Sequence, residues 1–236
     1  MTGARSDILA GIRHSLGRGV LGGEGEAKVE ARLRDPARNL VPARAKVPQY
    51  ERIAMFLDYL GRVDGTSVRV AKPEDVPEAL TRYLATENLP PRVVMAPDTR
   101  LAAIPWPAQR LLDVRHGEAA LDEPVGVTGA FAAIAETGTL LLTSGAHHPS
   151  RLNLLPDTHV VVLWASQIVG VMEDAWDALR ANGAVMPRTA LFVTGPSRTA
   201  DIEVTLYLGA HGPRRLHVIL VDDVVRSAAS TEGSPK

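Results

Sequence analysis

The chain contains no cysteine among its 236 residues. This absence excludes disulfide bonds, thiol nucleophiles and zinc sites built on thiolates. It also excludes an iron–sulfur cluster held by cysteine thiolates of this chain. Any redox chemistry in which the protein takes part therefore requires an organic cofactor or another subunit.

The sequence has neither an excess of one charge nor a long apolar run. The formal net charge is −1, with 22% charged and 45% hydrophobic residues, which is ordinary for a globular protein and gives no electrostatic reason to expect nucleic acid. No apolar run reaches the roughly 18 residues that span a bilayer. The N-terminus lacks the apolar region of a secretory signal. The composition therefore predicts a cytoplasmic protein with no membrane span and no nucleic-acid partner.

Common chemical signatures are missing as well. The sequence has no G-x-x-x-x-G-K-[ST], no G-x-G-x-x-G that opens a helix after a strand, and no G-x-S-x-G, which are the marks of nucleotide sites and of serine hydrolases. His147 and His148 are adjacent, but neighbours in sequence rarely point the same way and no carboxylate follows at a metalloprotease spacing. We therefore expect no metal site.

Apolar spacing divides the chain into three parts. Ile8, Ile12 and Leu16 recur at spacing four and predict a short helix over residues 5–17. Residues 18–48 mix Gly, Glu, Arg and Pro without an apolar period and predict a tail without regular structure. The expected organisation is an N-terminal helix and flexible tail at 1–47, an α/β domain at 48–225, and a polar C-terminal tail at 226–236.

Helical and strand patterns alternate within the central domain. Several predicted strands, above all Thr158–Trp164 and Leu216–Val221, are apolar along almost their whole length, which is typical of strands buried on both faces of a parallel sheet. Two other apolar runs flank Glu136–Gly138 and predict a strand pair joined by a tight turn at Gly138. The sequence thus predicts an α/β fold with a mixed, largely parallel sheet between helices.

A first candidate site is the turn after the predicted strand Ala190–Val193. Residues 202–208 contain no helix breaker and stop at Gly209, which predicts a helix. The turn would offer free backbone N–H groups and the positive end of a helix dipole, with Ser197 or Thr199 as cap. Arg198 adds donors suited to carboxylate or phosphate. An anion pocket and a structural turn in which Arg198 pairs with Asp201 both remain open.

A second candidate site is the run of small residues at 125–145. Glu136, in an apolar neighbourhood, suits an acid, base or nucleophile, or alternatively accepts hydrogen bonds from turn amides and holds the loop. The loop that follows carries Ser144, Gly145 and Arg151, which either line a site or form a solvated connection.

The runs AIAETGTLLLTSG, RLNLLPDTHVVV and TGPSRTADIEVTLYLGAHGPRRLHVILVDD resemble the lactate utilization C branch of the LUD-domain family. The resemblance covers most of residues 50–222. It implies a fold related to the CoA-transferase, ribose-5-phosphate isomerase and 5-formyltetrahydrofolate cyclo-ligase group, in which a glycine-rich segment and a polar turn line the substrate cleft. The matching positions here are Gly129, Glu136, Thr137, Gly138, Ser144 and Gly145, then Gly195, Ser197, Arg198, Thr199 and Asp201.

The resemblance implies a role in oxidising L-lactate to pyruvate beside two partners, one or both of which carry iron–sulfur clusters. Our first hypothesis is an accessory or substrate-binding subunit that holds a small carboxylate or phosphate between residues 195–201 and the Glu136–Gly145 region, with no cofactor of its own. The alternative is a stand-alone isomerase or transferase that acts on a phosphorylated or acyl substrate, with Glu136 as base or nucleophile. A regulator or scaffold with a vestigial cleft is a third reading.

Overall fold

The computed structural model describes residues 3–19, 21–181, 186–199 and 207–224. The chain divides into two compact units, Met1–Leu40 and Val41–Lys236. Within the described residues, no helix is long and apolar enough to cross a membrane.

The first unit consists of the helices α1 (Gly3–Ser15) and α2 (Gly23–Arg34), and neither helix buries a residue. Helix α1 confirms the predicted N-terminal helix. Helix α2 corrects the prediction that residues 18–48 lack regular structure. It has acidic residues in its first turn and basic residues in its last turn, and Lys28 Nζ donates to Glu24 Oε1 at 2.8 Å one turn away. Local charge pairing, rather than an apolar stripe, therefore favours this helix.

The second unit contains three sheets. The main sheet is six-stranded, with the order β1-β12-β7-β4-β2-β3, and every pairing in it is parallel. Its strands are β1 (Thr66–Val70), β2 (Arg92–Met95), β3 (Asp113–His116), β4 (Val125–Gly129), β7 (Thr158–Trp164) and β12 (Arg215–Val221).

The second sheet has four strands in the order β8-β5-β6-β9, and β10 pairs antiparallel with β11 in a small ribbon. The strands of these two sheets are β5 (Ala132–Ile134), β6 (Thr139–Thr143), β8 (Ile168–Val169), β9 (Ala190–Val193), β10 (Arg198–Thr199) and β11 (Tyr207–Leu208). The helices of this unit are α3 (Gln49–Arg62), α4 (Val76–Thr86), α5 (Thr99–Ala102), α6 (Arg151–Leu154) and α7 (Met172–Ala181), with short 3-10 turns at Ala43–Ala45, Pro73–Asp75, Trp106–Ala108 and Ala165–Gln167.

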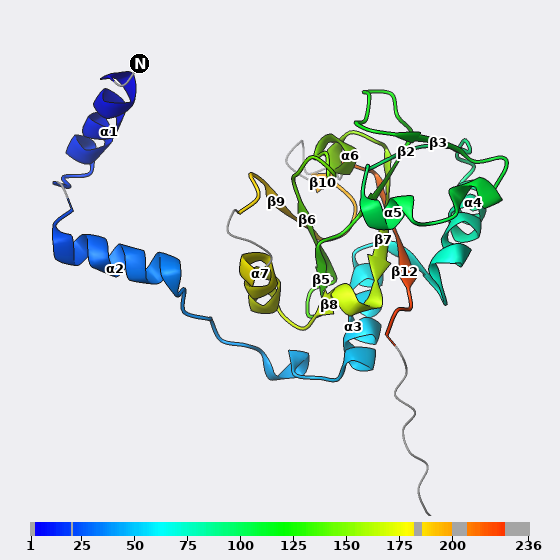
Figure 1. Ribbon diagram of the computed structural model, residues 1–236, viewed down its shortest axis with the longest axis horizontal. Helices are drawn as coiled ribbons and strands as arrows, with labels where there is room; N and C mark the ends of the chain where they lie inside the picture. The colour runs from blue at the N-terminus through cyan, green and yellow to red at the C-terminus, as the bar shows by residue number, and fades with distance from the viewer. Residues whose placement is uncertain (1–2, 20, 182–185, 200–206, 225–236) are drawn as a thin grey trace, which may run out of the picture. The chain divides into compact units, whose positions relative to one another are not determined.

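Alternation along the buried strands places two cores on opposite faces of the main sheet. On one face, Val160 and Val162 of β7 pack in a cluster with Leu80 and Leu84 of α4. On the other face, Val161 of β7 belongs to a cluster formed with α3 and the second sheet, because successive side chains of a strand point to opposite faces. The outer face of the second sheet packs against α7. Figure 1 shows α4 and α7 on opposite sides of the two sheets.

The predicted α/β class with a largely parallel sheet is confirmed. The antiparallel pairs lie outside the main sheet, in the four-stranded sheet and in the β10–β11 ribbon, and the sequence did not predict this separation. The turn at Glu136–Gly138 joins β5 to β6 as predicted, and Gly138 has a φ of 65°. A Cβ at Gly138 would stand 2.6 Å from the Leu60 backbone N of α3. Glycine is therefore required there both by the turn and by the close approach of α3.

Candidate functional site

The topology of the main sheet marks one edge as the place for a ligand. β2 and β4 are neighbours in this sheet. The next strand of the sheet after β2 is β3, which lies on the side of β2 away from β4, whereas the next after β4 is β7, which lies on the side of β4 away from β2. Connections that leave two neighbouring parallel strands in opposite directions open a crevice at the carboxyl ends of those strands. The loops that follow β2, β4 and β7 meet at this crevice.

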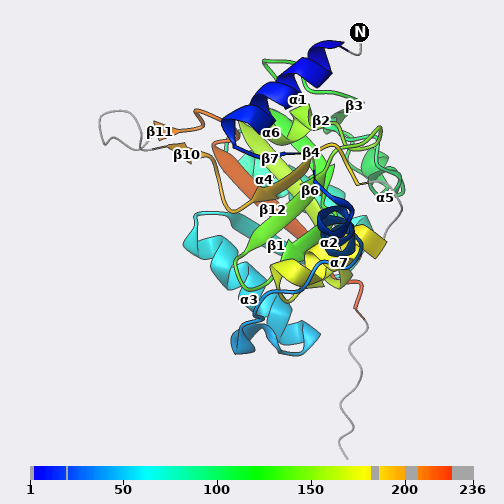
Figure 2. The same cartoon turned by 90° about the vertical axis from the view of Figure 1, so that its left-hand side faces the viewer.

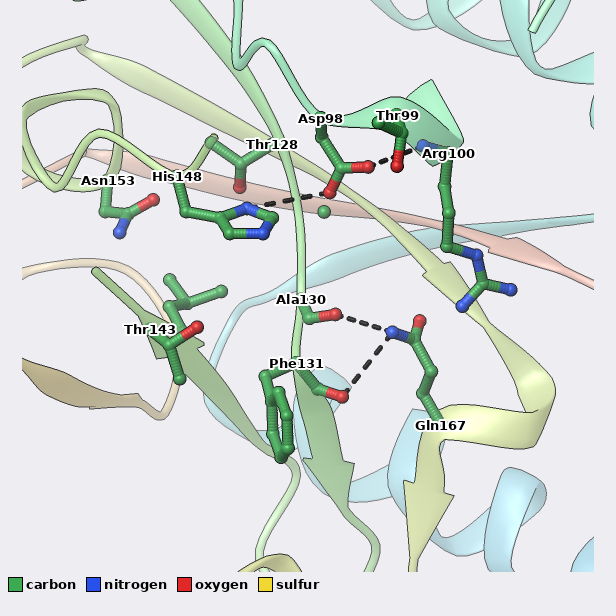
Figure 3. Close-up of a pocket in the computed structure, with 12 residues that line it drawn as sticks. Asp98, Thr99, Arg100, Thr128, Ala130, Phe131, Thr143, His148, Asn153 and Gln167 are labelled. Carbon is green, nitrogen blue, oxygen red and sulfur yellow. Dashed lines mark hydrogen bonds and ion pairs between the residues drawn. The ribbon is translucent and has the colours of Figure 1, made fainter. Parts of the chain in front are cut away.

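A cavity of about 560 Å³ fills this position, and we call it the cleft. Most of its polar lining follows the ends of parallel strands or belongs to the loop after β6 (Figure 3). The lining residues are Asp98, Thr99, Arg100, Thr128, Gly129, Ala130, Phe131, Leu142, Thr143, His148, Asn153 and Gln167.

Asp98 is fixed at the cleft by the start of α5. Its Oδ1 accepts hydrogen bonds from the backbone N–H groups of Arg100 at 2.7 Å and Leu101 at 3.4 Å, as expected of an aspartate that caps a helical turn. The other oxygen, Oδ2, lies 3.6 Å from His148 Nδ1 (Figure 3). Gly129 leaves room for the carboxylate, because a Cβ there would stand 3.0 Å from Oδ2. Asp98 therefore combines a structural cap with a charge directed at a histidine in the cleft.

Arg100 is held along the cleft by two contacts. Its guanidinium carbon lies 4.0 Å from the centroid of the Trp164 ring, and its Nη2 lies 3.6 Å from Asp223 Oδ2. Asp223 is in turn fixed by the backbone N–H and hydroxyl of Ser166, at 2.8 and 2.6 Å. The side chain of Arg100 remains 47% exposed, so donors of its guanidinium remain available. Cation–π stacking with an ion pair presets the orientation of the group.

Gln167 closes the cleft on the side of β7. Its Nε2 donates to the carbonyl of Ala130 at 2.6 Å (Figure 3). Its Oε1 accepts from the backbone N–H of Trp164. These bonds tie the end of β4 to the end of β7. The walls of the cleft are thus rigid where the two strands end.

Thr128 lines the cleft and contacts the buried His159, which lies outside the lining of the cleft. Thr128 Oγ1 lies 2.8 Å from Nε2 of His159, and His159 is 1% exposed. Burial lowers the pKa of His159 to about 4, because desolvation disfavours the imidazolium. His159 is therefore neutral near pH 7 and contributes hydrogen bonding but no charge.

The predicted strand-to-helix turn at 194–201 is wrong in its second half. Arg198 and Thr199 form β10, which pairs antiparallel with β11, Tyr207–Leu208 (Figure 2). The sequence predicted that Tyr207 and Leu208 end a helix. The backbone N–H of Ser197 donates to the Pro213 carbonyl at 2.8 Å, and Ser197 caps no helix among the described residues. Asp201 and the remainder of the predicted helix lie outside the described residues.

Arg198 is directed toward α3 and not toward the cleft. It forms an ion pair with Asp64 and donates to the Val63 carbonyl at 3.5 Å. It also lines a cavity of about 160 Å³ together with Arg214 and Arg215. Gly195 and Ser197 line a different cavity, of about 190 Å³, whose lining includes none of residues 136–145. Neither of these two cavities includes a residue of Glu136–Gly145 in its lining.

The two predicted segments are nevertheless neighbours. Thr137, Thr139 and Thr194 form a chain of hydroxyl contacts, each of 2.7 Å. Glu136 is largely buried, with its Oε2 3.8 Å from Arg44 Nη2, and its backbone N–H donates to the Gly170 carbonyl. Glu136 and Thr137 are not in the lining of the cleft. Glu136 therefore ties the turn between β5 and β6 to Arg44 and Gly170.

The predicted loop residues lie near the cleft without lining it. Ser144 Oγ accepts from the backbone N–H of Thr189 at 2.9 Å, and Gly145 forms a β-bridge with His148. The bridge positions His148 at the cleft. Arg151 lies 3.7 Å from Glu118 in an exposed ion pair. Of the described positions that the resemblance placed at a substrate cleft, Gly129 lines the cleft, and the loop that holds Ser144 and Gly145 supplies His148.

Asp98, Arg100 and Gln167 were missed as site residues. The sequence signal is their position, since the first two follow β2 and the third follows β7, and polar residues just after parallel strands gather at one edge of the sheet. Within the described part of the chain, no group of three or more His, Asp or Glu residues is arranged to hold a metal ion.

The fold and the cleft define an α/β domain with a polar ligand crevice at the carboxyl edge of a parallel sheet. Residues 114–221 match the LUD domain family. Lactate utilization protein C of Bacillus velezensis is 30% identical over 172 residues, which cover 70% of each chain. The protein of the same name from Bacillus subtilis is 40% identical over 102 residues, or 42% of each chain, so this match spans less than half of that relative. The chain belongs to the LUD-domain family of lactate utilization C proteins.

A solved structure supports the same assignment. The crystal structure of a DUF162 family protein from Deinococcus radiodurans is 27% identical to this chain, with a TM-score of 0.53. The match covers 74% of this chain and 99% of that one. Nearly the whole of that protein therefore shares the fold described above.

Proposed function

We propose that this protein serves lactate utilization as a subunit that binds a small 2-hydroxy or 2-oxo carboxylate in the cleft. The names of the Bacillus relatives support the pathway. The observation that carries the choice of ligand is the meeting of Arg100, His148 and Asp98 around one cavity. Arg100 supplies a cation for the carboxylate of the ligand, and the His148–Asp98 pair supplies a polar partner for the oxygen on carbon 2.

Each group has a distinct task in this proposal. Arg100 offers planar N–H donors that suit a carboxylate, and its stacking on Trp164 limits the entropy lost on binding. His148 accepts a hydrogen bond from the hydroxyl of lactate or donates one to the keto oxygen of pyruvate, since imidazole can do either. Asp98 orients His148 from 3.6 Å. The set thus distinguishes a 2-hydroxy or 2-oxo acid from a plain carboxylate.

Calorimetry tests the ligand. We expect L-lactate and pyruvate to bind, and propionate, which lacks the second oxygen, to bind at least several-fold more weakly. Arg100→Ala removes a charged hydrogen bond worth about 1.5–3 kcal/mol. Because the side chain is half exposed, the lower end applies, and affinity falls about tenfold. Arg82→Ala is the matched control, because Arg82 pairs with Glu78 on an exposed face of α4. The site is rejected if Arg100→Ala binds L-lactate as tightly as the wild type and Arg82→Ala do, or if propionate binds as tightly as L-lactate.

The proposal extends to partners that carry iron–sulfur clusters, since this chain has no cysteine to hold one. Affinity purification of the tagged protein from cells grown on L-lactate is expected to recover iron–sulfur proteins in a stoichiometric complex. Recovery of the protein alone, at native expression and low salt, contradicts a subunit role. The alternative of an independent enzyme would then have to be tested by turnover.

A further inference from the structure

A second cavity adjoins the cleft on the inner side of Asn153. It has a volume of about 190 Å³, and we call it the annex. Aliphatic and aromatic residues make up much of its lining, among them Leu154, Leu191, Phe192, Val193 and Leu216. Leu142 of the cleft and Leu191 of the annex are direct partners in the β6–β9 pair. The two cavities therefore lie side by side between the main sheet and the second sheet.

Asn153 belongs to the lining of both cavities. The residue is only 6% exposed, and its side-chain amide forms no hydrogen bond with any described residue. Because the residue lines both cavities, its amide is open to a molecule bound at their boundary.

Thr128 and His159 form the rest of the boundary. Thr128 lines the cleft, His159 lines the annex, and their side chains are 2.8 Å apart. The bond satisfies the Thr128 hydroxyl within the protein, and His159 is neutral near pH 7, for the reason given above. Neither residue places a charge at the boundary between the cleft and the annex. An apolar group at this boundary therefore meets no unpaired ion from these two residues.

We propose that the annex accepts the apolar side chain of the carboxylate bound in the cleft, so that the ligands are 2-hydroxy acids with side chains larger than the methyl group of lactate. This inference rests on the proposed function of the cleft. A dry apolar cavity of about 150 Å³ takes up benzene in a protein interior. The annex, at about 190 Å³, therefore has room for a butyl or phenyl group. The methyl group of lactate would leave the annex empty.

A chain-length series tests the inference on the wild-type protein. Calorimetry with L-lactate, L-2-hydroxybutyrate, L-2-hydroxyvalerate and L-2-hydroxyhexanoate is expected to show an affinity that rises about fourfold for each added methylene, the gain from burying one such group. If lactate binds and the longer acids bind equally or more weakly, the annex inference fails while the proposed function stands. If no 2-hydroxy acid binds, both fail.

A variant that fills the annex locates the effect. Gly212 lines the annex, and a Cβ there would meet Ser197 Cβ at 3.5 Å, which is an ordinary contact. Gly212→Leu is expected to abolish the gain with chain length and to leave lactate affinity within twofold. Gly61→Leu adds the same side chain on α3, where nothing lies within 4 Å of the new Cβ, and is expected to preserve the gain.

Two outcomes of the variant experiment overturn the inference. One is a gain with chain length that persists in Gly212→Leu, and the other is a gain lost equally in Gly61→Leu. If Gly212→Leu does not fold by circular dichroism, Gly212→Val carries the same test with a smaller side chain. It is expected to reduce affinity for 2-hydroxyhexanoate at least tenfold more than affinity for lactate.

Discussion

Asp98 offers a prediction in which a structural role and a ligand role separate cleanly. Asp98→Ala removes both the cap of α5 and the charge beside His148, whereas Asp98→Asn keeps a cap oxygen and removes only the charge. Asn and Asp are equally good cap residues, and loss of a cap costs about 0.5–2 kcal/mol. The contact with His148 is long, at 3.6 Å, and the His148 side chain is 41% exposed, so the pair contributes at most about 1 kcal/mol to folding.

Urea unfolding measures the capping role of Asp98, and calorimetry measures its role in ligand binding. We expect Asp98→Ala to lower the free energy of unfolding by about 1–2 kcal/mol and Asp98→Asn by less than about 1 kcal/mol. Both substitutions are expected to weaken L-lactate binding several-fold, because His148 loses the carboxylate that orients it. An Asp98→Asn protein as unstable as Asp98→Ala would refute the capping argument. Full lactate affinity in both variants would refute the role of Asp98 in the cleft.

Three further predictions concern hydrogen bonding, pH and backbone geometry. Asn153→Ala is expected to leave the free energy of unfolding within about 0.5 kcal/mol, since its amide has no described partner, and to weaken ligand binding by about 0.5–1.5 kcal/mol in calorimetry. Burial lowers the pKa of His159 and of His217 to about 4, so the unfolded chain binds protons that the folded chain does not between pH 6.5 and 4. The contribution of these histidines to stability is therefore complete above pH 6.5, and the free energy of unfolding falls by about 1.4 kcal/mol per pH unit per histidine as the pH decreases through this window. Urea unfolding at pH 7.5, 6 and 5 measures this fall. A free energy of unfolding that does not change with pH would show that these rings are not buried. Gly138→Ala is expected to lower the free energy of unfolding by roughly 1–3 kcal/mol because residue 138 has a positive φ. Gly61→Ala lies in a helix with open space around the new Cβ and is expected to raise the free energy of unfolding by up to about 1 kcal/mol. Equal free energies of unfolding for the two variants in urea would contradict this interpretation.

Local patterns in the sequence were sufficient for most individual elements. Ile53, Phe56 and Leu60 recur at helical spacing and form the buried face of α3, and Asp98, a typical cap residue, begins a short helical turn. These features depend on residues within a few positions of one another. The fully apolar run at 158–164 became β7, which is buried at every residue. Periodicity and capping chemistry therefore carry over directly.

The candidate site could not be found in the same way, because it depends on which strands are neighbours. Asp98 and Arg100 follow β2, while Gln167 follows β7, and β4 lies between these strands in the sheet. Nothing in the linear order fixes that arrangement. The helix predicted at 202–208 is wrong at its described end, for a different reason. The absence of a breaker predicted a helix, yet Tyr207–Leu208 is a strand, and tyrosine is a residue type that favours strands.

A crystal structure of the protein with L-lactate or L-2-hydroxyhexanoate tests the central claim most directly, because it locates the anion. The cleft and the turn at 195–201 are the two competing positions. We predict that the carboxylate lies within hydrogen-bonding distance of the Arg100 guanidinium, with the 2-hydroxyl at His148. A ligand bound against Arg198, with the cleft beside Arg100 empty, would contradict the account.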